Sequence, residues 1–166
     1  MGLLYAIPME HLWAPWRNLY VKDEQKNEGN IFAAIARGTD DEANYVLARG
    51  KGCFAVLNIY PYNTGHLMVI PYRETGALED LSDDELLEMM SMLKRLKAAI
   101  MAAFKPQGFN VGINLGAAAG AGIDQHLHVH LVPRWRGDAN FMTTTAETRV
   151  HPTELTAVYA AIRKQL

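Results

Sequence analysis

Three histidines, His126, His128 and His130, stand at alternate positions of the sequence, with aliphatic residues between them. A period of two is typical of a β-strand, whose successive side chains point to opposite faces. The three imidazoles would then face a surface or cleft, while Leu127, Val129 and Leu131 enter a core. The chain has 6 histidines, so this clustering favours chemistry near neutral pH over a half-exposed strand that carries histidines by chance.

Such a face could bind a metal or attack phosphorus. Alternate strand positions can offer two imidazoles to zinc, but the Cα atoms of His126 and His130 would lie about 13 Å apart on a straight strand. Neutral imidazole can instead attack a phosphate, forming a phosphoramidate that another acceptor resolves, while its neighbours orient it and stabilise charge. The glycine- and alanine-rich run 116–122 allows main-chain N–H groups to approach an anion closely. We therefore favour the nucleophilic mechanism.

The flanking sequence predicts a single α+β domain over residues 1–166, with 1–10 as a loose lead-in. The expected sheet is five-stranded and mostly antiparallel, with strands at 45–48, 53–58, 66–71, 108–115 and the histidine segment ending at Pro133. A turn at 50–52 joins the first two strands, and 60–65 is a loop.

Three helices are expected around this sheet. Asn30 and Gly38 are the expected N-cap and stop of a short helix. Ser82 opens a capping box before a long helix that follows the third strand and runs to about Phe104. Pro152 would open a closing helix that ends at Leu166. In the long helix, we expect the methionines to fill the core: Met89, Met90, Met92 and Met101.

Composition narrows the choice of partners. A formal net charge of -2 over 166 residues gives no general attraction to nucleic acid or to an anionic membrane. The single cysteine, Cys53, lies in an apolar run and suggests a buried side chain without a disulfide. Neither a signal peptide nor an apolar run of membrane-spanning length is recognisable, so we expect a cytoplasmic protein.

The segment His126-Leu127-His128-Val129-His130-Leu131-Val132 resembles the signature of the histidine triad (HIT) superfamily of nucleotide hydrolases and transferases. Two further blocks stand in the family's order: Asn58 eight residues before His66 with its apolar strand, and Asn114-Leu115-Gly116 with Ala119-Gly120. The resemblance runs from about Ile31 to Arg134. Segments 12–17 and 133–142 look like the bacterial branch that includes diadenosine tetraphosphate phosphorylases.

The resemblance implies a HIT-like fold and a role for each matching residue. His128 would be the nucleophile that takes a nucleoside monophosphate covalently, with His126 and His130 beside it and His66 supporting the network. Asn58 would hold the ribose hydroxyls, although it could be only a turn residue. Base and phosphate contacts would come from Ile31, Phe32, Ile35, Leu57, Ile59, Asn114, Gly120, Ala121 and Gly122.

Several positions keep a structural alternative. The apolar residues of the expected base pocket could be plain core, and His66 could be a surface histidine at the start of a strand. We interpret His11 and His151 as structural or exposed. The segment with Trp13, Trp16 and Arg17 suggests packing, a dimer surface or contact with the substrate.

Two departures from the family pattern matter. Many members carry a Gln followed by Ser or Thr before the triad, where this chain has Ala121-Gly122-Ile123; Gln125 could substitute. Relatives that bind zinc have Cys-x-x-Cys where this chain has Asn30-Ile31-Phe32-Ala33. We therefore expect neither a metal nor a cofactor.

The resulting hypothesis is a nucleotidyl transferase or hydrolase. It would cleave a dinucleoside polyphosphate, such as diadenosine tetraphosphate, through a covalent nucleotidyl-histidine, with phosphate or water as acceptor. The alternatives are a hydrolase of nucleoside phosphoramidates (AMP-lysine or AMP-NH2 type), a non-catalytic nucleotide-binding protein, and a metalloprotein built on the histidine strand. The resemblance also implies a homodimer or higher homo-oligomer.

Overall fold

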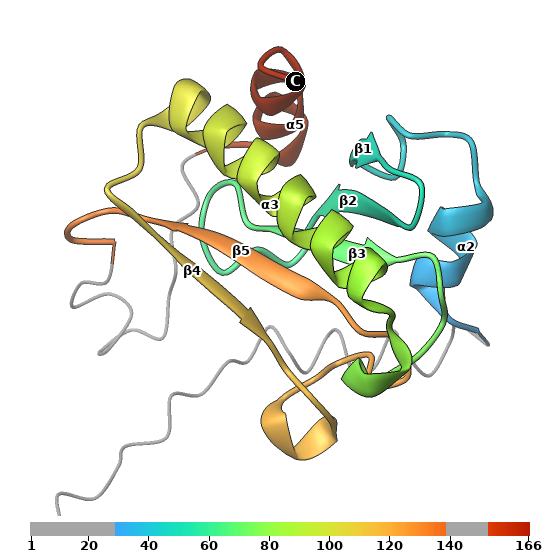
Figure 1. Cartoon of the computed structure of the whole chain (residues 1–166). Helices are drawn as coiled ribbons and strands as arrows, with labels where there is room; N and C mark the ends of the chain where they lie inside the picture. The colour runs from blue at the N-terminus through green and yellow to red at the C-terminus, as the bar shows by residue number, and fades with distance from the viewer. Residues whose placement is uncertain (1–28, 139–152) are drawn as a thin grey trace, which may run out of the picture.

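The computed structural model describes residues 29–138 and 153–166 (Figure 1). Its centre is a five-stranded sheet in the order β1-β2-β3-β5-β4, in which every neighbouring pair is antiparallel. The strands are β1 (Val46–Arg49), β2 (Cys53–Leu57), β3 (Leu67–Pro71), β4 (Gly108–Ile113) and β5 (Val129–Arg134). The α+β prediction is thereby confirmed.

The histidine strand is shorter than the sequence suggested. Pairing of β5 begins at Val129, opposite Val69 of β3 and Ile113 of β4. His126 and His128 therefore precede the strand, and their placement within it was wrong. The side chains of residues 126–128 still alternate between two faces, although the backbone there is not paired with a neighbouring strand. The alternating sequence pattern therefore extends beyond the strand itself.

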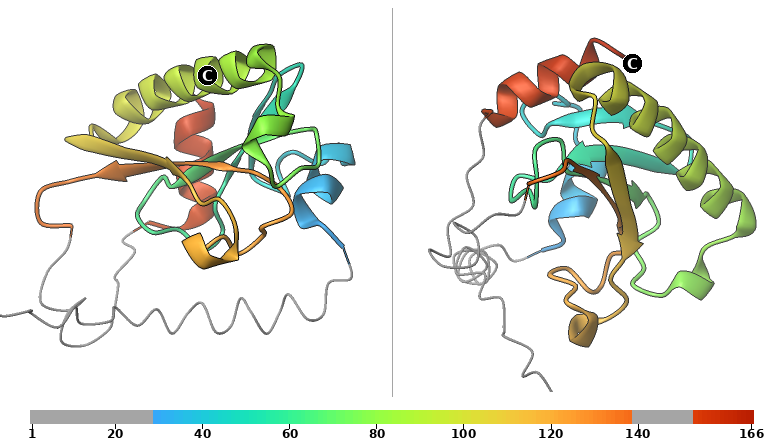
Figure 2. Two further views of the ribbon diagram at one scale, coloured as in Figure 1. Left: turned by 60° about the horizontal axis from the view of Figure 1, so that its bottom comes forward. Right: turned by 90° about the vertical axis from the view of Figure 1, so that its left-hand side faces the viewer.

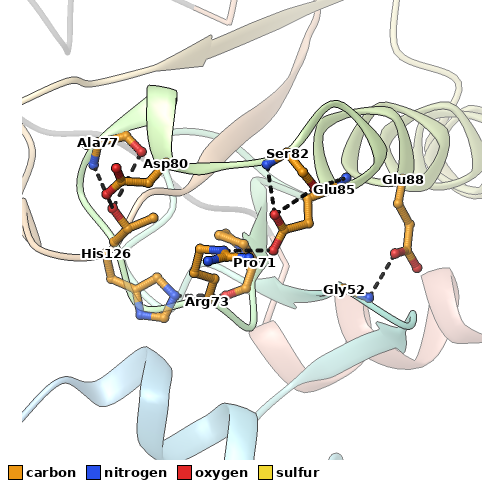
Figure 3. Close-up of polar contacts among 10 residues, drawn as sticks. Gly52, Pro71, Arg73, Ala77, Asp80, Ser82, Glu85, Glu88 and His126 are labelled. Carbon is orange, nitrogen blue, oxygen red and sulfur yellow. Dashed lines mark hydrogen bonds and ion pairs between the residues drawn. The ribbon is translucent and has the colours of Figure 1, made fainter.

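Helix α3 (Asp83–Phe104) covers one face of the sheet, as Figure 2 shows. Its predicted capping box is present: the Ser82 hydroxyl accepts from the N–H of Glu85, and the Glu85 carboxylate accepts from the N–H of Ser82 (Figure 3). Another carboxylate of the helix, that of Glu88, accepts the N–H groups of Lys51 and Gly52 in the β1–β2 turn. The turn is thus fixed to the helix.

The main core lies between α3 and the sheet. Leu96 and Ile100 of α3 are fully buried with Leu67 and Leu131 of the strands. The prediction that four methionines fill this core was half wrong. Met89 and Met92 are buried, but Met90 is 54% and Met101 45% exposed, because these two lie on the outer side of the helix.

Helix α2 (Ile31–Arg37) packs on the opposite face of the sheet (Figure 2). Asn30 is its N-cap and Gly38 its C-cap, as predicted. Phe32 joins a second apolar cluster with Phe54, Val56, Met68, Ile70 and Ile123. Because β2 and β3 are covered on both faces, all their residues are buried.

Helix α5 (Leu155–Arg163) packs against β1 and α3. Its Tyr159 hydroxyl donates to the carbonyl of Val46, and Arg163 donates to the carbonyl of Leu47. Two 3₁₀ turns complete the described chain, η1 (Leu78–Asp80) and η2 (Ala117–Ala119). No helix in the part of the chain that the structure describes is long and apolar enough to span a membrane.

Some sequence predictions fall outside the described residues. These are the lead-in 1–10, His11, Trp13, Trp16, Arg17, residues 139–142 of the tail, His151 and Pro152.

Candidate active site

The predicted separation of histidines from aliphatic residues is confirmed. Leu127, Val129 and Leu131 belong to the core beneath α3. His130 lies opposite Met68 of β3 and Gly112 of β4, so its ring is on the other face. The ring centroids of His128 and His130 are 4.8 Å apart. The fold therefore gathers the imidazoles on the face that carries α2.

His128 is held in the tautomer that suits a nucleophile. Its Nδ1 lies 2.9 Å from the carbonyl oxygen of His126. A carbonyl oxygen can only accept, so Nδ1 carries the proton and Nε2 of the neutral ring carries the lone pair. Burial lowers the pKa of His128, partly offset by this hydrogen bond. The ring is therefore neutral at physiological pH.

His66 and His130 form a buried pair. The N–H of Tyr62 donates to Nδ1 of His66, and Nε2 of His66 lies 2.9 Å from Nδ1 of His130. Burial, with the nearby His130 and His128, lowers the pKa of His66 to about 3, so this ring is neutral and donates through Nε2. Nδ1 of His130 then accepts, and a neutral His130 carries its own proton on Nε2.

The two neighbouring rings thus have complementary roles in hydrogen bonding. His128 offers a lone pair on Nε2, and His130 an N–H at the same ring position. This is the combination that attack on a phosphorus atom and stabilisation of the developing charge require. Tyr62 packs over His66 and His130, with ring centroids 4.5 and 5.8 Å away, and helps to exclude water from the pair.

The surroundings of His126 hold its ring in place. It is fully buried, and its Nε2 lies 2.8 Å from the carbonyl oxygen of Pro71; Figure 3 shows the ring beside Pro71 at the end of β3. Its Nδ1 lies 2.9 Å from the amide nitrogen of Asn30. Both ring nitrogens therefore have protein partners.

Across residues 29–138 and 153–166, no group of three or more His, Cys, Asp or Glu side chains is placed to hold a metal ion.

A cavity of about 120 Å³ opens beside His128 and His130. One wall is apolar, and the edge of Phe32 meets the His128 ring at a centroid distance of 5.2 Å. The other wall offers amides and glycine backbone, a combination typical of ligand sites. The lining residues are Ile31, Phe32, Asn58, Ile59, Tyr60, Tyr62, Met68, Asn114, Gly120, Gly122, Ile123, His128 and His130.

Four of the residues expected at the substrate do not line this cavity. Leu57 is buried in the core beneath α3, because strand alternation turns it to the face opposite Val56, which belongs to the second apolar cluster. Ile35 packs one helical turn further along α2, against the second apolar cluster. Ala121 is not part of the wall, and Gln125 is exposed at the surface of its loop. These four residues therefore lie outside the cavity lining, and their contact with the substrate stays a prediction.

Sequence reasoning missed other lining residues. Met68, Ile123 and the loop residues Tyr60 and Tyr62 also line the cavity. Met68 could have been found from the strand period, since it lies two positions after His66. Nothing local marks the tyrosines or the Asn30–His126 contact, which joins residues 96 positions apart.

A five-stranded antiparallel sheet with three alternating histidines beside a pocket defines the class of HIT-domain proteins. Residues 40–137 match the family model described as the HIT domain. The chain therefore belongs to the HIT family, as its sequence suggested.

Known proteins of this family support that placement. The chain is similar to an AP-4-A phosphorylase of Mycobacterium tuberculosis, 46% identical over 151 residues, covering 87% of this chain and 77% of the relative. It is 34% identical over 93 residues to a Bis(5'-nucleosyl)-tetraphosphatase [asymmetrical] of Schizosaccharomyces pombe, covering 56% of this chain and 50% of that protein. These are nucleotide-processing enzymes by name, which confirms the prediction of a HIT-family enzyme.

The fold of this chain is also similar to that of a solved HIT-like protein. A HIT-like protein from Bartonella henselae superimposes with a TM-score of 0.66 and 26% identity, covering 84% of this chain and 98% of that one.

Proposed function

We propose that this protein cleaves a dinucleoside polyphosphate of the diadenosine tetraphosphate kind and transfers the nucleotidyl group through a covalent histidine intermediate. The observation that carries the proposal is the His128–His130 pair, in which a neutral imidazole with its lone pair on Nε2 lies beside an Nε2–H donor. The phosphorylase and the tetraphosphatase among its relatives support the choice of substrate.

In the first step, Nε2 of His128 attacks the phosphorus nearest the bound nucleoside. The N–P bond forms as the P–O bond to the rest of the chain breaks, and the departing polyphosphate keeps the electron pair. His130 donates a hydrogen bond through Nε2–H and stabilises the charge that develops on oxygen. In the second step, an oxygen of inorganic phosphate or water attacks the same phosphorus, and the N–P bond breaks to restore His128.

The remaining histidines position this pair. His66 fixes the tautomer of His130, and the His126 carbonyl fixes that of His128. In this proposal, Ile31, Phe32 and Ile59 hold the base and Asn58 the ribose. Asn114, Gly120 and Gly122, which line the same cavity, would bind the phosphates.

The first experiment is a product assay with diadenosine tetraphosphate in the presence and absence of inorganic phosphate. Phosphorolysis would give ADP plus ATP, and hydrolysis AMP plus ATP. We expect His128→Ala to lower kcat more than about 1,000-fold, while urea unfolding shows a folded protein. Binding without turnover in the wild type would favour a nucleotide-binding protein. Turnover of adenosine 5'-phosphoramidate alone would favour the phosphoramidate hydrolase.

We also propose that two copies associate through β4, which is one of the two edge strands of the described sheet. Val111 is 53% and Leu115 48% exposed beside this edge, and an apolar strand edge is a natural site for pairing. Light scattering should give a dimer or a larger assembly, and Val111→Asp should shift it towards a monomer. An unchanged mass would contradict this. Cytoplasmic location and single-domain organisation stay predictions from the sequence.

A further inference from the structure

A second hollow of about 400 Å³ lies on the β4 side of the histidines. It shares Tyr62, Asn114 and His130 with the cavity described above, and we call it the β4–β5 groove. Its other lining residues are Asn63, Asn110, Val111, Gly112, Val132, Arg134 and Asp138. We propose that this groove binds the nucleoside of the departing half of the substrate. The inference rests on the function proposed above.

The floor of the groove is set by strand register. His130 lies opposite Gly112, and Val132 opposite Asn110, so these four positions share one face of the sheet. Among residues 29–138 and 153–166, no atom outside Gly112 and its two chain neighbours lies within 4 Å of the place where a Cβ on Gly112 would be. The groove is therefore open directly beside His130 because this position lacks a side chain.

The direction of the groove suits a departing group. The cavity extends from His128 towards α2, whereas the groove extends from His130 along β5 to Arg134. Four strand residues span about 13 Å. A dinucleotide whose first phosphorus meets His128, with its nucleoside in the cavity, can pass His130 and lay its other half along the groove.

The walls of the groove are fixed by the chain itself. Asn63 donates to the carbonyl of Pro133 and to Asp138, which ties the loop after β2 to the end of β5. Arg134 donates to both oxygens of Asp138, at 2.7 and 2.9 Å, and to Asn110 at 2.8 Å. Such bidentate contacts hold the groove in shape before a ligand arrives.

The charged residues of the groove lining indicate which part of the substrate the groove would bind. Among the described residues that line the groove, Arg134 and Asp138 are the only Arg, Lys, Asp or Glu, and they neutralise each other. A phosphate chain would call for uncompensated cations. The groove instead offers the side-chain NH2 of Asn110, whose oxygen accepts from Arg134, together with the ring of Tyr62. An amide donor and an aromatic ring suit an uncharged ring system with polar edges, which is a nucleoside.

The test compares two substrates with the same four phosphates. Diadenosine tetraphosphate has the second nucleoside, and adenosine 5'-tetraphosphate lacks it. Gly112→Val fills the floor of the groove, and Gly112→Ala fills it less. Gly108→Ala is the matched control, because it adds the same methyl group to the same face of β4 outside the lining, 3.9 Å from Cβ of Arg134.

We expect Gly112→Val to raise KM for diadenosine tetraphosphate about tenfold, and Gly112→Ala to raise it less. In both Gly112 variants, kcat/KM for adenosine 5'-tetraphosphate should stay within about twofold of the wild-type value. In Gly108→Ala, kcat/KM for each of the two substrates should stay within the same range. Light scattering and thermal unfolding check that the variants keep the assembly and fold of the wild type.

Three results would overturn the assignment. Equal losses on both substrates would mean that the groove holds the phosphate chain or supports the histidines. Unchanged KM values in Gly112→Val would mean that the groove is not used. A wild type that binds adenosine 5'-tetraphosphate as tightly as diadenosine tetraphosphate would remove the need for a second nucleoside site. If the wild type turns over neither substrate, the proposed function itself fails.

Discussion

The side chain of Asn30 connects the start of α2 to His126, with its amide nitrogen 2.9 Å from Nδ1 of the ring. Its oxygen meanwhile accepts the N–H groups of Phe32 and Ala33 as the N-cap of the helix. One residue therefore both begins the helix that walls the nucleotide cavity and fixes the first histidine of the triad. Its two roles can be separated by substitution.

Asn30→Ser keeps a capping oxygen but loses the amide donor, whereas Asn30→Ala loses both. We expect Asn30→Ala to reduce the free energy of unfolding by about 1 kcal/mol more than Asn30→Ser, measured by urea denaturation. Both variants should lose kcat, because His126 is no longer held. Full activity in Asn30→Ser would show that the contact with His126 has no positioning role.

Arg49 supports the same helix from its other end. Its guanidinium donates to the carbonyl groups of Ile35, Ala36 and Gly38, and it pairs with Asp41. We expect Arg49→Lys to raise KM for diadenosine tetraphosphate about fivefold, equivalent to roughly 1 kcal/mol, with kcat nearly unchanged. The physical reason is that a lysine ammonium cannot match the planar fork of arginine.

Arg73→Lys is the control for this change. Arg73 forms an exposed pair with Glu85, and pairs of this kind contribute little. The KM of the Arg73→Lys variant should equal that of the wild type. If Arg49→Lys changed kcat alone, or if both variants behaved alike, the positioning of α2 by Arg49 would be refuted.

The pH dependence of the reaction follows from the histidine pKa values. Burial lowers the pKa of His128, so its nucleophilic lone pair persists below the usual value of 6.5. We expect kcat/KM to stay level as pH falls to 6.5 and to decline only at lower pH. An acid limb centred at or above the ordinary histidine pKa would contradict a desolvated nucleophile.

The free energy of unfolding should also decrease as the pH falls, as kcat/KM does. The pKa of His66 is about 3 in the folded protein against 6.5 for an unperturbed histidine. Between these values the unfolded chain binds the proton more strongly, so stability falls as pH falls from about 6.5 towards 3. We expect His66→Gln to reduce this slope in urea unfolding measured from pH 7 to pH 4. An identical slope in the variant would show that His66 ionises normally.

The sequence predicted the elements whose signals are local. The alternation from His126 to Leu131, the caps Asn30 and Gly38 and the capping box at Ser82 all depend on neighbouring residues, and all are present. Such features can be read without knowing the fold, because strand alternation and helix capping act within a few positions.

The remainder depended on contacts between distant segments. The start of β5 at Val129 is set by its partners Val69 and Ile113. Leu57 faces the core beneath α3 although Asn58, the next residue, lines the cavity, and the pairing of β2 decides which face each residue takes. The exposure of Gln125 likewise depends on how the loop before the triad folds. Periodicity alone does not determine which face of a strand meets the ligand.

The most direct measurement is a single-turnover reaction with diadenosine tetraphosphate labelled in its adenylyl phosphates, quenched under conditions that preserve phosphoramidates and followed by peptide mass spectrometry. The account predicts an adenylyl group on the peptide that contains His128. It also predicts that the group appears and decays at rates compatible with turnover, and that His128→Ala does not form it. Turnover without this adduct, or the same adduct in His128→Ala, would contradict the account.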